Sequence, residues 1–270
     1  MKPLVLAMLV AMLAQAALAQ DGARDNPLID GPTWQELRDD FVPSGTDVRD
    51  GAALFTVDAP YRANDAATVP VVIRQVDPTV TLRKAQVIID ENPAPMAADL
   101  TFGDRMQPVD FELRVRIDQY SNVRVLATTE AGTFMSGRFV KASGGCSAPA
   151  TKDPTAALAS MGQMRLKHFD ESDNMSGQRR DAQIMIRHPN YSGLQRDQIT
   201  QLFVSAHFID SLEVYQGEEL LFSLEGGISV SENPVFRFVY TDNGAPTLTV
   251  RAHDTEGNLF EQVLPKSVQS

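Results

Sequence analysis

Short segments in which apolar and polar side chains alternate recur along this sequence, and they constrain its fold more than any other feature. Residues 111–117, for example, read FELRVRI, so every second side chain is apolar. A period of two places these side chains on one face of a β-strand, as in a half-buried antiparallel sheet. Strand-like segments lie at 53–57, 69–73, 85–90, 109–117, 123–127 and 133–140 in the first half, and at 182–188, 212–215, 219–224, 235–240, 248–252 and 259–263 in the second. The pattern predicts an all-β fold.

Turn-forming residues divide the predicted strands, and their spacing indicates the architecture. They lie at 90–95, 121–122, 216–217, 242–244 and 255–258. Six or seven short strands over about 100 residues are typical of an immunoglobulin-like β-sandwich, and the pattern occurs twice. Helical periods between the strands are absent, which argues against a parallel α/β sheet and the dinucleotide-binding folds built on it. We predict two immunoglobulin-like β-sandwich domains in tandem.

One short amphipathic helix is predicted before the first strand. Trp34, Leu37 and Phe41 recur at helical spacing. Thr33 is a suitable N-cap, and Pro43 follows the predicted end.

A segment with few large apolar residues joins the two halves. Residues 142–162 read ASGGCSAPATKDPTAALASMG, a composition typical of a linker or an exposed arm. We therefore divide the chain into a signal peptide (1–19), a first sandwich with its helix (20–141), the arm and linker (142–162) and a second sandwich (163–270).

The first twenty residues have the features of a secretory signal peptide. Lys2 precedes an apolar stretch at 4–13, and Ala17-Leu18-Ala19 forms a small-x-small cleavage signal. The apolar stretch is shorter than the about 20 residues of a membrane span, and no later stretch approaches that length. We expect a soluble mature chain that is exported to an oxidising, extracytoplasmic compartment.

Charge and cysteine content exclude several classes of function. The chain has 24 Lys and Arg against 35 Asp and Glu, a formal net charge of −11, and no basic run, so nucleic acid is not an expected partner. Its one cysteine can form neither an intramolecular disulfide nor a CxxC redox or zinc motif.

That cysteine, Cys146, is the main candidate functional residue. It follows Gly144 and Gly145 and precedes Ser147, in a loop with no apolar face. We expect its thiol to be exposed on a flexible tether that can enter a cleft of another protein. The alternative is a buried cysteine that acts as a small hydrophobic residue. Lys141 is the nearest cation in the sequence.

Other catalytic and metal-binding patterns are missing. His168, His188, His207 and His253 are scattered without metal-ligand spacing, so no metal site is predicted from them. The sequence has no GxSxG nucleophile elbow. Residues 170–174 (DESDN) lack the Gly and the terminal Glu of a calcium loop, and we interpret them as a solvated turn. We therefore expect no resident cofactor and no catalytic residue.

Ordered motifs in both halves resemble a known family. In the first half, residues 59–71 (APYRANDAATVPV) lead into a predicted strand, and Gly144-Gly145-Cys146 follows the last one. Motifs in the second half are His188-Pro189, Gly193, Ile199, 214–219 (VYQGEE), 228–234 (ISVSENP) and 254–257 (DTEG). In this order they are similar to the SoxY and SoxZ subunits of the SoxYZ sulfur carrier of periplasmic thiosulfate oxidation, here fused in one chain. The resemblance makes 20–141 a SoxY-like domain and 163–270 a SoxZ-like domain.

The resemblance implies that Cys146 carries a covalent sulfur adduct, a thiosulfonate or persulfide, on an arm that includes Gly144, Gly145 and Ser147. It implies a periplasmic carrier without turnover of its own, which presents the adduct to partner enzymes. Such partners are periplasmic oxidoreductases, c-type cytochromes or a quinoprotein (PQQ) dehydrogenase, with which fused carriers of this kind are associated.

One departure from the family pattern affects the choice of partner. SoxY ends in Gly-Gly-Cys-Gly-Gly, whereas here Ser147-Ala148-Pro149 follows and the chain continues. An internal arm can loop into a cleft but cannot enter it end-first.

Two other functions remain open on the sequence. A non-carrier interaction module for a quinoprotein dehydrogenase or cytochrome system would tolerate Cys146→Ser. A thiol enzyme would need a base near Cys146 and would turn over when purified alone.

Overall fold

The structure is a computed structural model that describes residues 26–29, 31–149, 154–169, 177–197 and 200–266. The predicted signal peptide at 1–19 and the predicted turn at 170–174 lie outside these residues. None of the described helices is long and apolar enough to cross a membrane.

The first half contains one helix, a 3₁₀ turn and eight strands within the described residues. These are α2 (Pro32–Phe41), β1 (Val48–Asp50), β2 (Phe55–Asp58), β3 (Val69–Gln75), β4 (Lys84–Ile89), β5 (Met96–Phe102), η1 (Asp104–Met106), β6 (Asp110–Val115), β7 (Ser121–Thr129) and β8 (Gly132–Val140).

The second half begins with a short helix and continues as strands. Its described elements are α3 (Pro154–Ala159), β9 (Met164–His168), β10 (Arg179–Ile186), β11 (Ile209–Gln216), β12 (Glu219–Gly226), β13 (Val235–Thr241), β14 (Thr247–Asp254) and β15 (Leu259–Pro265). The predicted all-β sandwich class is confirmed, and every predicted strand segment overlaps an observed strand.

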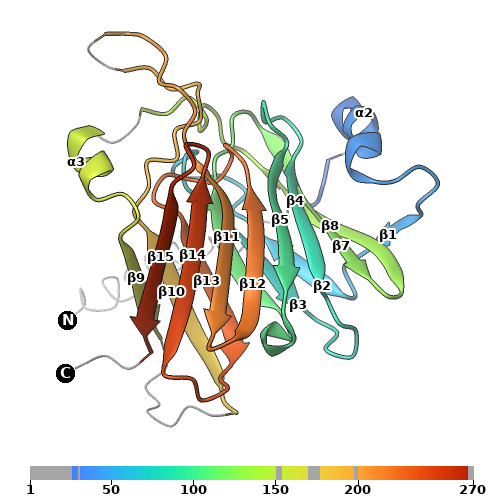
Figure 1. Ribbon diagram of the computed structural model, residues 1–270. Helices are drawn as coiled ribbons and strands as arrows, with labels where there is room; N and C mark the ends of the chain where they lie inside the picture. Colours follow the sequence, from blue (N-terminus) through green and yellow to red (C-terminus); the bar gives the residue numbers. More distant parts are fainter. Residues whose placement is uncertain (1–25, 30, 150–153, 170–176, 198–199, 267–270) are drawn as a thin grey trace, which may run out of the picture.

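The described strands form two sheets, and both sheets run through the two halves of the chain (Figure 1). The larger sheet has nine strands in the order β1-β8-β7-β4-β5-β12-β11-β14-β15. The smaller has six, in the order β2-β3-β6-β13-β10-β9. The halves meet where β5 pairs antiparallel with β12 and where β6 pairs antiparallel with β13. The two sandwiches are therefore joined edge to edge, with no unpaired strand edge between them.

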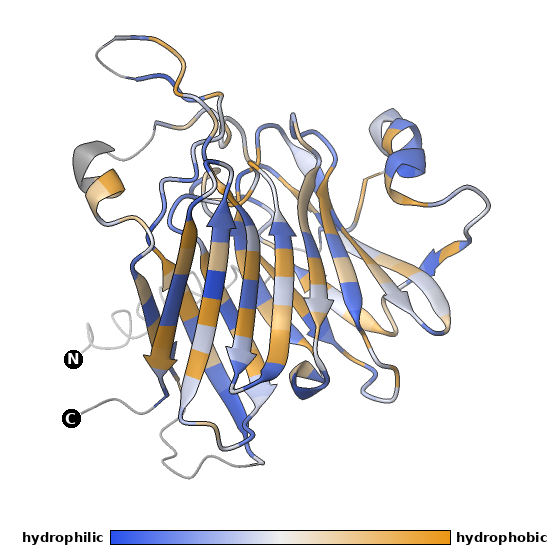
Figure 2. Cartoon of the chain, in the orientation of Figure 1, coloured by the Kyte–Doolittle hydropathy of each residue, from blue (hydrophilic) through white to orange (hydrophobic). Residues whose placement is uncertain are grey.

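A single hydrophobic core fills the space between the sheets. Figure 2 shows the alternation of apolar and polar residues along the strands, and in β10 buried residues take every second position. We call the junction of β5 with β12 and of β6 with β13 the seam. There, Phe111 of the first half contacts Phe222 of the second, with ring centroids 5.0 Å apart. The ring centroids of Phe102 and Phe111 lie 5.5 Å apart. Edge-to-face aromatic pairs of this kind contribute about 0.5–1.5 kcal/mol beyond the burial of their area.

Helix α2 begins at Pro32 with Gly31 as N-cap, so the prediction of Thr33 as N-cap was wrong. Proline suits the first helical position because its fixed φ is already helical and its missing N–H has no partner there. The helix ends at Phe41, as predicted. Trp34 and Phe41 pack against a small cluster on the outer side of the large sheet.

Three strands and one helix were not predicted. Strand β5 (Met96–Phe102) reads MAADLTF, in which Ala97 and Ala98 are both buried, so alternation is lost. Strands β1 and β9 are short, with three and five residues. Helix α3 lies inside the segment that we predicted to be a linker.

Candidate functional site

Cys146 lies in a segment of residues 142–149, called the arm here, that follows β8. Its exposed fraction is 0%, so the prediction of an exposed thiol on a flexible tether was wrong for this structure. The backbone N–H of Gly144 donates to the carbonyl of Asp118 at 2.7 Å, and that of Gly145 donates to the carbonyl of Ile117 at 3.0 Å. These bonds hold the arm against the segment that follows β6.

The two glycines permit this position for different reasons. Gly144 has φ of +76°, a conformation that glycine adopts without the strain of a side chain. A Cβ atom at Gly145 would overlap the carbonyl oxygen of Ala66 and would lie 2.7 Å from that of Ile117. The glycines that suggested a flexible tether instead allow close backbone packing.

A loop from the second half also holds the arm. The Ser192 hydroxyl donates to the carbonyl of Cys146 at 2.5 Å, and the Gln195 side-chain amide donates to the carbonyl of Ala148 at 3.0 Å. Both side chains are buried, with exposed fractions of 3% and 2% for the residues. Gln195 Oε1 also accepts from the backbone N–H of Ser192 at 3.2 Å, which ties the two together.

Sequence reasoning found Gly193 in this loop but missed Ser192 and Gln195. Both point at backbone carbonyls of a segment about fifty residues earlier in the chain, and no local spacing or composition signals such a contact.

The surroundings of Cys146 disfavour its thiolate. Burial and, to a smaller extent, the Asp118 carboxylate raise the pKa of the thiol to about 12, and the Arg116 guanidinium opposes both. The thiol is therefore protonated at pH 7, whereas the thiolate is the reactive form. The Lys141 ammonium, the nearest cation in the sequence, lies 4.9 Å from the centre of the Tyr61 ring. The Cys146 thiol is therefore a poor nucleophile in this position.

Arg116 is a second residue that sequence reasoning did not select. We placed it on the polar face of a strand, but β6 ends at Val115 and Arg116 is 1% exposed. Its Nη1 donates to the carbonyls of Ile228 and Val230 in the second half. Its Nε has no hydrogen-bond partner among the described residues. Burial lowers the pKa of the guanidinium.

A pocket adjoins the outer side of the arm. It has a volume of about 260 Å³ and is lined by Ser147, Pro149, Leu194, Arg196, Asp197 and Gln201. Ser147 and Pro149 are exposed here, so the arm has one face in the protein and one at the surface.

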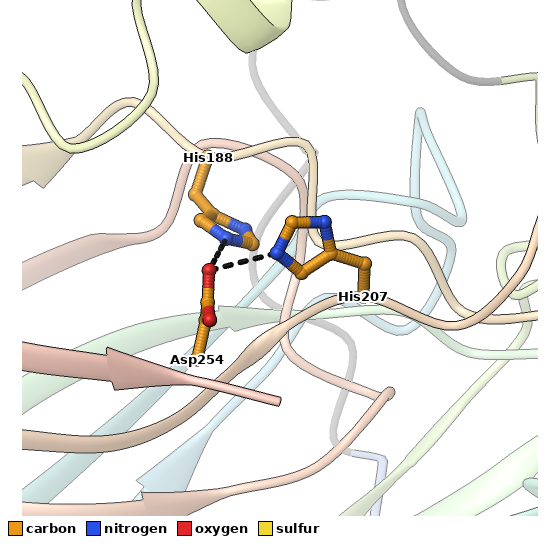
Figure 3. Close-up of side chains that lie close together, drawn as sticks. All are labelled: His188, His207 and Asp254. Atoms are coloured by element: carbon orange, nitrogen blue, oxygen red, sulfur yellow. Dashed lines mark hydrogen bonds and ion pairs between the residues drawn. The ribbon is translucent and has the colours of Figure 1, made fainter. Parts of the chain in front are cut away.

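Two of the four histidines lie together, although the sequence suggested that all were scattered (Figure 3). Nε2 of His207 lies 2.7 Å from Oδ2 of Asp254, and Nε2 of His188 lies 3.3 Å from the same oxygen. The three potential ligand atoms are within 4.8 Å of one another, which is close enough for them to hold one metal ion.

The hydrogen bonds of this cluster oppose metal binding. The backbone N–H of Asn190 donates to Nδ1 of His188 at 3.0 Å, so the neutral ring carries its proton on Nε2. That proton faces Asp254, which leaves Nε2 without a free electron pair for a metal. Burial opposes ionisation of Asp254, but hydrogen bonds from Asn258, His207 and His188 outweigh it and hold its pKa well below the usual range. The cluster is a hydrogen-bonded carboxylate between two strand ends.

Comparison with known proteins finds a separate family model for each half of the chain. The family model described as "Sulfur oxidation protein SoxY" matches residues 39–146. The model described as "Sulphur oxidation protein SoxZ" matches residues 168–265. No curated protein matched the sequence. Among solved structures, the sulfur carrier protein SoxY from Chlorobium limicola f thiosulfatophilum is 23% identical, with a TM-score of 0.34, over 42% of this chain and 97% of that one.

The chain is thus a tandem β-sandwich protein with a SoxY domain in its first half and a SoxZ domain in its second. It belongs to the SoxYZ-like proteins, with the two domains fused.

Proposed function

We propose that this protein is a periplasmic carrier of sulfur compounds, which holds a covalent adduct on Sγ of Cys146 and presents it to partner enzymes. One observation carries the proposal: the SoxY match ends at Cys146, the only cysteine of the chain. The fused SoxZ domain supports it, because its Ser192 and Gln195 bind the arm that bears this cysteine.

Loading with thiosulfate is a two-electron oxidation. A new S–S bond joins Sγ of Cys146 to the outer sulfur of thiosulfate, the thiol proton goes to water, and two electrons pass to a partner electron acceptor such as a c-type cytochrome. The product is a cysteine thiosulfonate, and hydrolytic loss of its sulfonate as sulfate leaves a persulfide. The protein supplies the cysteine that holds the adduct, and the partner enzymes catalyse its oxidation and hydrolysis.

Export to the periplasm is part of the proposal. It is supported by the charged start, the apolar stretch and the Ala17-Leu18-Ala19 site of the first twenty residues. A buried thiol suits an oxidising compartment, because intermolecular disulfide exchange needs an accessible thiolate.

The burial of Cys146 favours one second candidate. If the arm stays in place, the protein acts as an accessory module of a periplasmic quinoprotein dehydrogenase or cytochrome system and binds through its sandwich faces. In that case Cys146→Ser preserves function, whereas the carrier loses all activity with the same change.

The mass of the intact protein, purified without reductant from its native compartment, tests the carrier. We expect added sulfur-containing mass that disappears on reduction and is missing from Cys146→Ser. An unmodified thiol that stays unchanged with thiosulfate and a fraction containing the partner enzymes would contradict the proposal and favour the accessory module. The same spectrum locates the signal-peptide cleavage, which we expect after Ala19.

A further inference from the structure

The buried arginines of the described residues differ in their ionic partners. Nε of Arg124 lies 2.8 Å from Oδ1 of Asp90, and Nη1 of Arg180 lies 3.8 Å from Oδ2 of Asp242. Arg116 is more deeply buried than either, with an exposed fraction of 1%, yet it forms no ion pair with a carboxylate of the described chain. A buried charge without a partner of opposite sign is costly. The positive charge of Arg116 therefore needs an explanation.

The hydrogen bonds of Arg116 do not explain its charge. Its Nη1 donates to the carbonyls of Ile228 and Val230, which links the first half of the chain to the second. Neutral carbonyls accept from a neutral donor as well as from a charged one. Nε is also buried and has no partner among the described residues. A purely structural link would leave both the charge and this donor unused, so the guanidinium is suited to an anion.

Cys146 can supply that anion when its thiol loses a proton. The backbone N–H of Gly145 donates to the carbonyl of Ile117 at 3.0 Å, so the residue before Cys146 is bonded to the residue after Arg116. The two side chains are close enough that each shifts the pKa of the other. The negative charge of Cys146 acts on Arg116 more strongly than that of Glu232 does.

We infer that Arg116 is the counter-ion of Cys146, whose guanidinium stabilises the negative charge of the Sγ thiolate inside the protein. The Asp118 carboxylate acts in the opposite sense and disfavours the thiolate. Since the thiolate is the form that makes bonds to other atoms, Arg116 promotes any reaction of this thiol. Only its use in loading a sulfur adduct rests on the proposed carrier function.

The rate of alkylation by iodoacetamide tests the counter-ion. The thiolate of Cys146 forms a C–S bond, iodide leaves with the electrons of the C–I bond, and the thiol proton goes to the buffer. Below the pKa of the thiol, the rate is proportional to the thiolate fraction. In Arg116→Gln, which removes the charge, we expect labelling at pH 8 to slow by about tenfold or more, the effect of a pKa one unit higher. Arg116→Lys keeps the charge and should recover most of the rate.

The sign of the change separates a counter-ion from a structural link. Loss of a link alone would loosen the site and speed the labelling of a buried thiol. Arg114→Gln is the matched control, because it removes the same charge two residues earlier, from a side chain that is 43% exposed. It should label like the wild type, and in denaturant all variants should label alike. Labelling of Arg116→Gln that equals or exceeds that of the wild type would overturn the inference.

A double-mutant cycle tests the same pair without a reagent. Cys146→Asp places a carboxylate at this position, and Cys146→Asn is its neutral counterpart. We expect Arg116→Gln to lower the urea midpoint of unfolding more in Cys146→Asp than in Cys146→Asn, because only the first protein loses an ion pair. Equal shifts would contradict the counter-ion.

The cycle remains informative if Arg116→Gln does not fold, which circular dichroism shows. With Arg116 in place, Cys146→Asp should be at least as stable at pH 7 as Cys146→Asn. An unpaired buried carboxylate would make it much less stable, and that result would overturn the inference.

The proposed carrier function fails separately. If the labelling rates and the cycle agree with our expectations but the protein never acquires a reducible sulfur adduct, the carrier is contradicted and the counter-ion stands. If the adduct forms on Cys146 but Arg116→Gln labels like the wild type, the counter-ion is overturned and the carrier stands.

Discussion

Two of the contacts between the halves of this molecule differ in kind. At the seam, β5 pairs with β12 and β6 pairs with β13 over an apolar interior in which Phe111 and Phe222 are in contact. At the arm, the contact consists of hydrogen bonds from Ser192 and Gln195 to backbone carbonyls. Burial of large aromatic side chains makes the first contact permanent, whereas each bond of the second has a small net free energy and can be exchanged for water. The first contact thus depends on apolar burial, and the second depends on hydrogen bonds to the backbone.

The seam is the place where a substitution should have the largest effect. Phe111→Ala removes a fully buried ring and leaves a cavity, and we expect the free energy of unfolding to fall by about 3–5 kcal/mol. Because the core is shared, urea should unfold both halves in one transition, followed by circular dichroism and by Trp34 fluorescence. Two separate transitions would show that the halves are independent. Phe203→Ala, at a site 61% exposed, should change stability by no more than about 0.5 kcal/mol.

The arm should respond to substitution without loss of the fold. In Gly145→Ala the new Cβ overlaps the carbonyl of Ala66, so we expect a displaced arm, fast alkylation of Cys146 and nearly unchanged unfolding. In Gly144→Ala the new Cβ would meet only the Ser147 hydroxyl, at an ordinary distance of 4.0 Å, so its main cost is the positive φ, about 1 kcal/mol. Labelling in Gly145→Ala should therefore exceed that in Gly144→Ala. The reverse order would mean that backbone conformation, not close packing, fixes the arm.

The carboxylate cluster of the second half should make stability depend on pH. The folded protein lowers the pKa of Asp254 below its ordinary value of 3.8, so the stability gained from ionisation is present at pH 7 and is lost as pH falls below about 4. We expect Asp254→Asn to unfold at a lower temperature at pH 7, with a free energy lower by about 1–3 kcal/mol. Its unfolding temperature should depend less on pH below about pH 4. If the unfolding temperature of Asp254→Asn falls with acid as steeply as that of the wild type, this role of Asp254 is contradicted.

The smallest effect is expected from added metal. Because the proton on Nε2 of His188 faces Asp254, stoichiometric zinc should leave the unfolding temperature unchanged. If zinc raises the unfolding temperature of the wild type but not that of His207→Ala, the cluster binds zinc and the proton of His188 is not on Nε2.

Much of the fold could be predicted from the sequence, because a strand with one buried face has a local signature. Segment 111–117 shows it fully, whereas Ala97 and Ala98 in β5 are both buried and conceal it. The seam had no such signature, since pairing between β5 and β12 depends on which edges meet and not on the pattern within either strand.

The sequence predicted the functional residue of the candidate site but not the residues that surround it. Cys146 and its two glycines were recognisable in the sequence. Its burial depends on Ile117, Ser192 and Gln195, which are distant in the chain. Glycine was interpreted as freedom of motion because composition does not distinguish a mobile backbone from one that must pass close to another.

The attachment of the arm at both ends limits how far Cys146 can travel. It is bound to β8, which ends at Val140, and to α3, which begins at Pro154. Since an extended residue spans about 3.3–3.6 Å, a loop of this length that leaves and returns can project by roughly 20 Å at most. The chain must also leave and return through the same opening. A partner enzyme that reaches Cys146 therefore needs a slot wide enough for a doubled chain, rather than a narrow tunnel.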